Sequence, residues 1–488
     1  ISGDFLRPSL NGELYLNKPP LYNWIVAASY KVFGSYDAIS LRFPVVFSVL
    51  LHGLLIFFIV RRYASDTVAG ITALAFATNW RTLTLDSMIG LLEHTLALVI
   101  YAGFMWIFIF GEKKKWLWLF LGSYFLTAIG FLIKGLPSIA HQGIALLVYF
   151  IYAKKFRLLF SWQHMAGVLL FVLVCALFYI PFSLHNKISY AAIIDKLFNE
   201  RAKRYGFTGI GQVISVFFDF PLDFIKHFLP WTIFIIVLFR KGTFNRIFEN
   251  RFVFFNALLF VGNLPVYWMA SLKNPHYLYF FLPLLFTVLF YLWDLLDVKD
   301  WRRMGIEILF GIVISAGLVA AVYAPFSDWI SSIEGKWFKA AIVAAGLAFV
   351  LFYFIRRKEI RLYGIVGFLL MIRLAFNWFV IPQRVEDQMK FPRIADQILE
   401  IVKDKPLYIA GSYPAGFYDP ITYPVEEKRN EILRMADNLQ PGNYYLVDEI
   451  NLQKFQPEVL LEFPFRYADL NLRFEGKIYL TQSRRAAE

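Results

Sequence analysis

The sequence predicts an all-α polytopic membrane protein that ends in a small α/β soluble domain. The composition is the first reason: of 488 residues, 58% are hydrophobic and 19% aromatic, and the mean hydropathy is +0.54. These values lie well above those of soluble globular chains. Apolar windows of span length recur along most of the chain, and short basic linkers separate them at every second break.

The apolar windows give the predicted spans, because an α-helix needs about 20 apolar residues to cross a bilayer. The weakest windows are 64–82, which contains Asn79, and 226–240, which is short. The twelve candidate spans lie at 40–60, 64–82, 88–110, 116–133, 136–153, 164–184, 226–240, 252–270, 277–296, 304–324, 337–355 and 362–382.

Basic linkers orient these spans. If every window crosses the membrane, the linkers all lie on one face, and enrichment of Lys and Arg in short loops marks the cytoplasmic side. Charges at the other breaks then lie on the outer face. The six linkers are Arg61-Arg62, Lys113-Lys114-Lys115, Lys154 to Arg157, Arg240 to Arg251, Lys299 to Arg303, and Arg356-Arg357-Lys358.

Three segments interrupt the pattern of spans. Residues 1–36 are predicted to form an outer loop and a short interfacial helix over Leu21–Phe33, with Tyr and Trp suited to the headgroup region. Residues 185–225 form a second large outer loop. After Pro382 the hydropathy falls, so residues 1–382 are predicted to be the transmembrane domain and 383–488 a soluble α/β domain on the outer side.

The soluble domain shows alternating short strands and one helix. Strand-like runs occur at Leu407–Ala410, Tyr444–Val447 and Lys477–Leu480, and a helical pattern lies near Glu426–Leu439. Its 14 Lys and Arg against 17 Asp and Glu give −3, so the membrane part carries the excess positive charge. The net charge of +13 therefore reflects membrane topology, and no nucleic-acid partner is expected.

The start of the chain and its cysteine content limit the interpretation further. Cys175 is the only cysteine, which excludes an internal disulfide. Ile1 to Leu16 lacks the basic start and apolar core of a signal peptide. Because the sequence does not begin with Met, we expect an N-terminal piece to precede Ile1.

Cations on the predicted outer face are the main chemical signal. They are disfavoured there by the positive-inside rule, and together they suit an anion at the membrane surface. Taken singly, a cation of this kind is more often a solvated or snorkelling side chain. The groups concerned are Lys18, Lys134, Arg201, Arg204 and Lys273, followed by His276 and Tyr277.

Acidic residues near the same face complete a possible reaction site. Asp86 lies in the turn before a span, where it could cap the next helix or act as a general base. Glu93 and His94 lie about two turns deeper and are costly unless they face a cavity or a partner. Fixed cations can stabilise a departing lipid phosphate, and a carboxylate can take a proton from an attacking hydroxyl. That combination describes sugar transfer from a polyprenyl-phosphate donor.

At these residues the sequence resembles the family 39 glycosyltransferases of the GT-C fold. This family includes the protein O-mannosyltransferases and the bacterial aminoarabinose transferase that modifies lipid A. The resemblance covers most of residues 1–290, and the overall plan extends to the C-terminus. The matching motifs are Gly3-Asp4-Phe5, Lys18-Pro19-Pro20-Leu21, Arg42-Phe43-Pro44, Leu85-Asp86, Lys134-Gly135, Glu200 with Arg204, Leu229-Pro230-Trp231, and Lys273 with Pro275-His276-Tyr277.

The resemblance implies a multi-pass enzyme of the bacterial inner membrane with a periplasmic active site and a periplasmic C-terminal domain. It would invert the anomeric centre and release polyprenyl phosphate. By the same resemblance, Asp86 matches an acidic position in the second outer loop, and the full protein has thirteen spans, one of them before Ile1. The residues that would hold the donor phosphate are Lys18, Arg204, Lys273 and Tyr277.

Two departures from the family pattern limit what carries over. The family's principal catalytic Asp precedes the Gly3-Asp4-Phe5 motif, so we expect the chain as given to lack it and to be inactive. Asn17 and Arg201 occupy positions that hold a zinc-associated Glu and His in the aminoarabinose branch. A zinc site of that kind is therefore not expected, no metal ligand is assigned, and another divalent metal stays open.

The sequence leaves other functions open. A flippase or transporter for an anionic lipid or solute is the main alternative, although its substrate site should lie near the membrane midplane. A non-catalytic scaffold is a third. For the transferase, the acceptor could be lipid A, another glycan or a protein, and the sugar is not specified.

Overall fold

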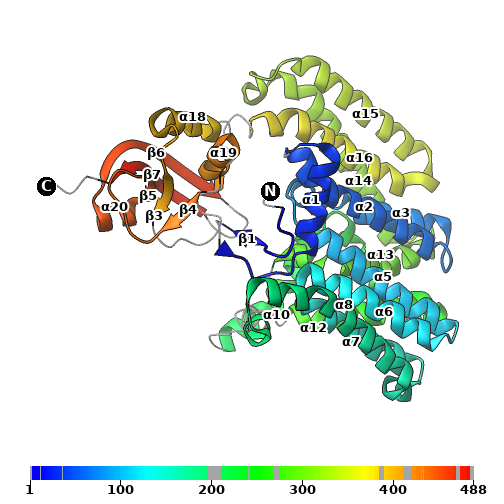
Figure 1. Cartoon of the computed structure of the whole chain (residues 1–488). Helices are drawn as coiled ribbons and strands as arrows, with labels where there is room; N and C mark the ends of the chain where they lie inside the picture. The colour runs from blue at the N-terminus through cyan, green and yellow to red at the C-terminus, as the bar shows by residue number, and fades with distance from the viewer. Residues whose placement is uncertain are drawn as a thin grey trace. The chain divides into compact units, whose positions relative to one another are not determined.

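The computed structural model describes residues 3–10, 13–35, 37–195, 210–239, 242–268, 274–383, 390–410, 419–429, 431, 433–468 and 473–483. The chain divides into two compact units (Figure 1). The larger contains Ile1–Arg7 and Leu16–Phe376, and the smaller contains Pro8–Tyr15 and Asn377–Glu488. The boundary that the sequence suggests, at 382/383, stays a prediction.

The larger unit is helical and contains most of the predicted spans. Among the described residues, seven helical segments are long and apolar enough to cross a membrane. These are Ala38–Val60 (α2), Glu93–Glu112 (α5), Trp116–Lys134 (α6), Trp162–Asn186 (α8), Trp301–Phe326 (α14, Trp301–Tyr323, with a 3-10 turn), Lys336–Arg356 (α15) and Lys358–Gln383 (around α16, Arg361–Ala375).

Three predicted spans form shorter apolar helices, namely Asp66–Thr78 (α3), Pro137–Tyr152 (α7) and Phe281–Asp294 (α13). At 1.5 Å per residue the 16 residues of α7 reach about 24 Å, less than the roughly 30 Å of a bilayer core. The other α-helices that the structure describes in this unit are Leu21–Phe33 (α1), Trp80–Thr84 (α4), Ile210–His227 (α10), Thr243–Glu249 (α11) and Arg251–Trp268 (α12).

Two windows differ from the prediction of continuous helices. Window 64–82 breaks at Asn79, which has extended backbone and accepts a hydrogen bond from the Thr82 amide, so it ends α3 and caps α4. Window 226–240 does not form a span-length helix, and that prediction is wrong. There α10 ends at His227 and a 3-10 helix covers Trp231–Leu238. Within the described residues, seven helical segments reach span length, against the twelve that the sequence predicts.

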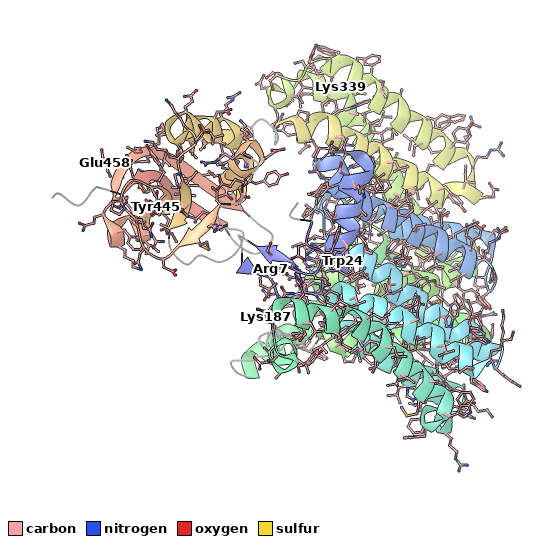
Figure 2. The ribbon with its side chains drawn as sticks, in the orientation of Figure 1. Arg7, Trp24, Lys187, Lys339, Tyr445 and Glu458 are labelled. Carbon is pink, nitrogen blue, oxygen red and sulfur yellow. The ribbon has the colours of Figure 1, made fainter. Side chains whose placement is uncertain are left out.

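The predicted helix at Leu21–Phe33 is confirmed with these bounds as α1. Pro19 and Pro20 precede it, and Gly34 ends it with φ 65°, a left-handed conformation that glycine adopts without steric cost. The indole Nε1 of Trp24, labelled in Figure 2, donates to the carbonyl of Phe5 at 3.1 Å. This contact fixes the loop before α1 against the helix.

Helix packing in the larger unit joins α5 to its neighbours on several sides. α5 packs against α2, α6 and α7, and α13 packs against α3 and α12. α14, α15 and α16 pack on one another, and α16 also contacts α3. Figure 1 shows α14 to α16 in yellow-green to yellow. α5 therefore lies in the interior of the unit and carries buried groups along its length.

The smaller unit contains a five-stranded mixed sheet in the order β4-β3-β5-β7-β6. β3 is parallel to β4 and β5, while β7 is antiparallel to β5 and β6. The strands are Leu407–Ala410 (β3), Arg434–Ala436 (β4), Tyr444–Asp448 (β5), Glu458–Ala468 (β6) and Arg473–Gln482 (β7). The helices are Lys390–Val402 (α18), Asp419–Arg429 (α19) and Glu449–Phe455 (α20). A separate hairpin pairs Ser9–Leu10 (β1) with Glu13–Leu14 (β2).

The core of this sheet confirms the α/β pattern but not the predicted helix near Glu426–Leu439. Ile398 and Val402 of α18 pack with Leu446 and Leu480 of the sheet, and all four are fully buried. The helix α19 ends at Arg429, and β4 follows because Tyr408 to Ala410 of β3 pair with Arg434 to Ala436. Backbone pairing with β3 thus overrides the helical pattern in the second half of the predicted helix.

Close packing at Gly111 gives a test of the α5–α7 contact. A Cβ at Gly111 would lie 2.2 Å from the Tyr149 ring, whereas a Cβ at Gly143 of α7 would meet nothing within 4 Å. We expect Gly111→Ala to destabilise the protein by about 1–3 kcal/mol, because a rigid ring must move. Thermal unfolding in detergent should show a lower Tm for Gly111→Ala and an unchanged or higher Tm for the control Gly143→Ala. Equal Tm values would contradict this packing.

Candidate active site

The turn between α4 and α5 holds a buried ion pair. After α4 the chain makes a short 3-10 turn over Asp86–Met88. Arg81 Nε donates to Asp86 Oδ2 at 2.7 Å, and Arg81 Nη2 donates to Oδ1 at 3.2 Å. Both side chains are at most 4% exposed. The two parallel bonds fix the orientation of the carboxylate as well as its position.

Tyr279, which lies just before α13, completes the surroundings of Asp86. Its hydroxyl also donates to Asp86 Oδ2, and the tyrosine is fully buried. Burial raises the pKa of Asp86, and the charge of Arg81 limits that rise. Asp86 is therefore an acid held by two partners from different parts of the chain, and its predicted catalytic role stays a prediction.

A second buried ion pair joins the beginning of α5 to the end of α6. Lys134 Nζ donates to Glu93 Oε1 at 2.9 Å, and both side chains are at most 7% exposed. His276 Nε2 lies 4.0 Å from the same oxygen. The Lys134 ammonium also lies 3.6 Å from the centroid of the Tyr277 ring, a cation–π distance. Lys134 lies at one predicted break, and His276 and Tyr277 lie at another. The structure brings all three together around Glu93.

Of the lysines and arginines that the sequence predicts for the site, the structure describes Lys134 and Lys18. Lys18 is exposed, and within the described residues it makes no ion pair. Burial lowers the pKa of His276 to about 4; Glu93 opposes this shift, and the positive charges of Lys134, Arg81 and Lys18 add to it. These three cations therefore act on one imidazole. Because two carboxylates neutralise Arg81 and Lys134, the charge of Lys18 remains available to an anion.

The structure does not describe every predicted site residue. Arg201, Arg204 and Lys273 lie outside the described residues, so their placement stays a prediction. Sequence reasoning missed the roles of Arg81 and Tyr279. Arg81 carried a signal, since a guanidinium five residues from Asp86 at a span end needs a partner. Nothing in the sequence pairs Tyr279 with Asp86, which lies 193 positions earlier.

Two further histidines are buried in α5 and α2. His94 packs against Tyr279 with 3.9 Å between ring centroids, and His52 of α2 packs against Tyr101. Both histidines are fully buried, and among the described residues none of their ring nitrogens has a hydrogen-bond partner. The polar cluster therefore continues from the helix ends into the interior.

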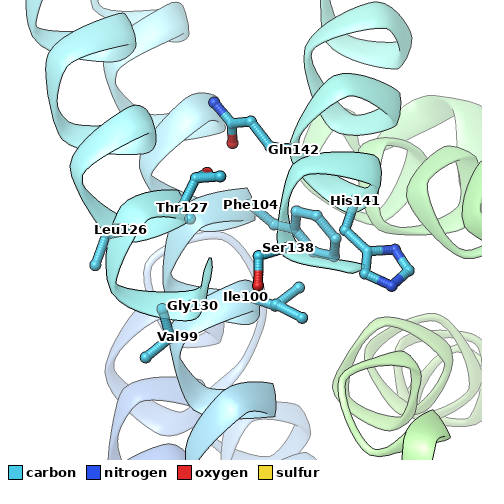
Figure 3. A pocket seen from close by; sticks show the side chains of 10 residues that line it. Val99, Ile100, Phe104, Leu126, Thr127, Gly130, Ser138, His141 and Gln142 are labelled. Carbon is cyan, nitrogen blue, oxygen red and sulfur yellow. The ribbon is translucent and has the colours of Figure 1, made fainter. Parts of the chain in front are cut away.

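The cavity shown in Figure 3 is too small for a sugar or a lipid. It lies among α5, α6 and α7, and its volume is about 10 Å³, the lower limit for one water molecule. Ser138, His141 and Gln142 contribute its polar lining. No set of three or more His, Cys, Asp or Glu side chains in the described part of the chain could hold a metal ion.

The ion pairs and the basic linkers lie at opposite ends of α5. Its 20 residues reach about 30 Å between Glu93 and Glu112. At the second end, Arg251 donates to Glu112 at 3.1 Å and to the Tyr152 hydroxyl at 2.8 Å, and Asn250 donates to the carbonyl of Tyr63. We call the end with Asp86, Glu93 and Lys134 the site end, and the end with Glu112 and Arg251 the linker end.

Comparison with known families finds a similarity in the N-terminal half of the helical unit. A family model described as dolichyl-phosphate-mannose-protein mannosyltransferase matches residues 17–180, which include Lys18, Asp86, Glu93 and Lys134. Residues 17–180, about a third of the chain, are therefore similar to this family. It is a family of GT-C membrane glycosyltransferases, as the sequence resemblance predicted.

Curated relatives of the chain are two uncharacterized proteins of Aquifex aeolicus (strain VF5). One is 23% identical over 329 residues, 67% of this chain and 63% of the relative. The other is 26% identical over 295 residues, 60% of this chain and 64% of the relative. The chain thus spans slightly less than two thirds of the length of these relatives.

Solved structures of ArnT from Cupriavidus metallidurans share the fold. The structure bound to undecaprenyl phosphate aligns with a TM-score of 0.68 and 18% identity, and the apo structure with 0.66 and 17%. Each alignment covers 98% of this chain and 90% of ArnT. The helical unit and the C-terminal mixed sheet therefore follow the ArnT architecture.

Removing one partner of the Arg81–Asp86 pair should be more damaging than removing both charges. Arg81→Ala leaves a buried carboxylate without its guanidinium, so we expect a loss of about 3–5 kcal/mol of stability. Adding Asp86→Asn should restore part of it. Chemical unfolding in detergent measures both, with Arg246→Ala at an exposed pair as a control costing at most about 1 kcal/mol. A double variant no more stable than Arg81→Ala would argue against a direct pair.

The lowered pKa of His276 predicts how stability depends on pH. Because the folded protein holds this imidazole neutral down to about pH 4, the unfolded chain binds the proton first as pH falls below about 6.5. The lowered pKa of His276 therefore costs the folded protein no stability above about pH 6.5. The free energy of unfolding falls as pH decreases from about 6.5 toward 4. We expect His276→Gln to flatten the change in Tm over this window. An unchanged pH profile would show that His276 is not buried in its neutral form.

Proposed function

We propose that this protein transfers a sugar from a polyprenyl-phosphate donor to an acceptor hydroxyl at the outer membrane face. The observation that carries the proposal is the cluster at the site end, where Lys18 and Lys134 lie with His276 and Tyr277 beside two buried carboxylates. The similarity of residues 17–180 to the mannosyltransferase family supports the reaction class. The undecaprenyl phosphate bound to ArnT supports a lipid-phosphate donor of similar chemistry.

The donor phosphate would bind to the cations of this cluster. Lys18 supplies a positive charge without an ion pair among the described residues, and Lys134 retains two N–H donors after its bond to Glu93. As the bond from the anomeric carbon to phosphate oxygen breaks, the electron pair passes to the phosphate. Fixed cations in a dry site stabilise that negative charge without reorganising. Arg201, Arg204 and Lys273 are further proposed ligands of the same phosphate.

Asp86 is the proposed acceptor of the proton. In the inverting reaction, the acceptor oxygen attacks the anomeric carbon from the face opposite the phosphate, and a carboxylate takes the hydroxyl proton. Burial raises the pKa of Asp86 and so its basicity, while Arg81 and Tyr279 fix its orientation. Glu93 is a second candidate, because its Oε2 has no hydrogen-bond partner among the described residues.

The acceptor and the cellular location are proposed at the level that the sequence allows. We propose a bacterial inner membrane protein with the site end and the C-terminal domain facing the periplasm, in agreement with basic linkers at the opposite end. Lipid A, another glycan and a protein are the acceptor classes to be compared. Each supplies the hydroxyl that the reaction consumes.

Binding of undecaprenyl phosphate to the purified chain tests the phosphate site without requiring turnover. We expect Lys18→Gln to weaken binding roughly ten- to a hundred-fold, as for loss of a charge-assisted hydrogen bond. Lys134→Gln is combined with Glu93→Gln, so that no buried charge is left alone. Lys31→Gln, an exposed position in α1, is the matched control and should bind normally. Unchanged binding in both site variants would contradict this assignment.

Turnover of the protein expressed from its full open reading frame tests the reaction itself. Given a labelled polyprenyl-phosphate sugar and lipid A, glycan or peptide acceptors, it should release polyprenyl phosphate in equal amount to the glycosylated product. If Asp86 is the base, Asp86→Asn should lower kcat strongly and change KM little. If Glu93 is the base, Glu93→Gln should have that effect instead. Movement of lipid across liposomes without covalent transfer would replace the transferase with a flippase.

A further inference from the structure

A groove at the linker end lies far from the proposed sugar-transfer site. It runs between α14 and α15 and has a volume of about 870 Å³. These helices are among the least buried of the span-length segments, with 17% and 22% of their apolar windows buried inside the protein. The groove therefore opens on a helix surface that faces lipid in a membrane.

The mouth of the groove is strongly basic. Lys299 and Lys358 line it and are exposed, and neither makes an ion pair within the described residues. Glu307 also lines it but accepts from two arginines, Arg303 at 3.1 Å and Arg361. Among the residues that line the groove, the three cations Lys299, Lys358 and Arg361 exceed the one carboxylate of Glu307 by two positive charges. A neutral or cationic ligand has no advantage there.

The wall of the groove is apolar and runs along one side of α14. The side chains recur at intervals of three to four residues, which places them on one helical face. From Met304 to Val319 the stripe extends about 22 Å, longer than the roughly 15 Å of one leaflet's hydrocarbon. The apolar lining comprises Met304, Ile308, Ile312 and Val319 of α14, with Leu351 and Ile355 of α15.

We propose that this groove binds one anionic phospholipid from the leaflet at the linker end. Its phosphate would lie against Lys299, Lys358 and the arginines that hold Glu307, and its acyl chains along the α14 stripe. The charge of the mouth favours an anionic over a zwitterionic headgroup, because basic pockets between spans select such lipids. This inference is independent of the proposed sugar transfer, whose phosphate site lies at the other end of the bundle.

The test is a titration of the delipidated full protein in detergent micelles with phosphatidylglycerol or phosphatidylcholine, followed by native mass spectrometry. We expect one tightly retained phosphatidylglycerol and weaker retention of phosphatidylcholine. Lys299→Gln with Lys358→Gln should weaken phosphatidylglycerol binding about 30-fold. The control Lys113→Gln with Lys115→Gln removes the same charge from another linker and should bind as the native protein does.

A second pair of variants tests the groove itself. Ala316 lines it and is exposed, so Ala316→Trp should fill it and abolish retention of either lipid. Ala345→Trp, at an exposed position of α15 outside the groove, is the matched control. Thermal unfolding confirms that each variant is folded. Equal retention of the two lipids, equal loss in the linker control, or normal binding by Ala316→Trp would overturn the proposal.

Discussion

The site end of the helical unit depends on one constraint, that charges buried at a membrane face need partners. Isolated, each of the four charged groups of the Arg81–Asp86 and Glu93–Lys134 pairs would cost several kcal/mol to bury. Paired, they join the α4–α5 turn internally and connect α5 to α6. Tyr279, His276 and Tyr277 then gather around carboxylates whose positions are already fixed. Charge neutralisation as well as helix packing therefore brings the residues of the site end together.

The same constraint separates the two ends of the bundle chemically. At the site end, buried acids cancel buried bases, and the uncancelled charge of Lys18 is exposed at the surface. At the linker end, Glu307 is shared by two arginines and the lysines around it are exposed to solvent or headgroups. The two ends therefore differ in how far their charged groups are buried: the paired groups of the site end are at most 7% exposed, whereas Lys299 and Lys358 at the linker end are exposed. Only the first arrangement favours chemistry on a bound phosphate.

Local signals predict much of the fold, and tertiary contacts account for the rest. Hydropathy and the Pro-Pro and Gly34 boundaries predict α1, and short continuous apolar runs predict the buried strands β3 and β5. Hydropathy averages over Asn79, so it misses the break that this side chain makes. The sequence could locate Asp86 and Lys134 at the ends of apolar segments. Its placement of Glu93 about two turns inside a span is wrong, because α5 begins at Glu93 after the 3-10 turn over Asp86–Met88. The sequence could not show that Lys134 bonds Glu93, 41 positions away, or that Arg81 is the partner of Asp86.

The contacts of the α4–α5 turn become possible at different times during synthesis of the chain. Asp86 accepts from Tyr279, 193 positions later, and the Leu83 carbonyl accepts from Arg373, 290 positions later. At about 5–20 residues per second, a ribosome reaches Tyr279 roughly 10–40 s after Asp86. Through that interval the turn has its local partner Arg81 but neither distant donor. The insertion machinery therefore handles a nascent protein whose carboxylate is neutralised early, while its final geometry is set only when the last helices arrive.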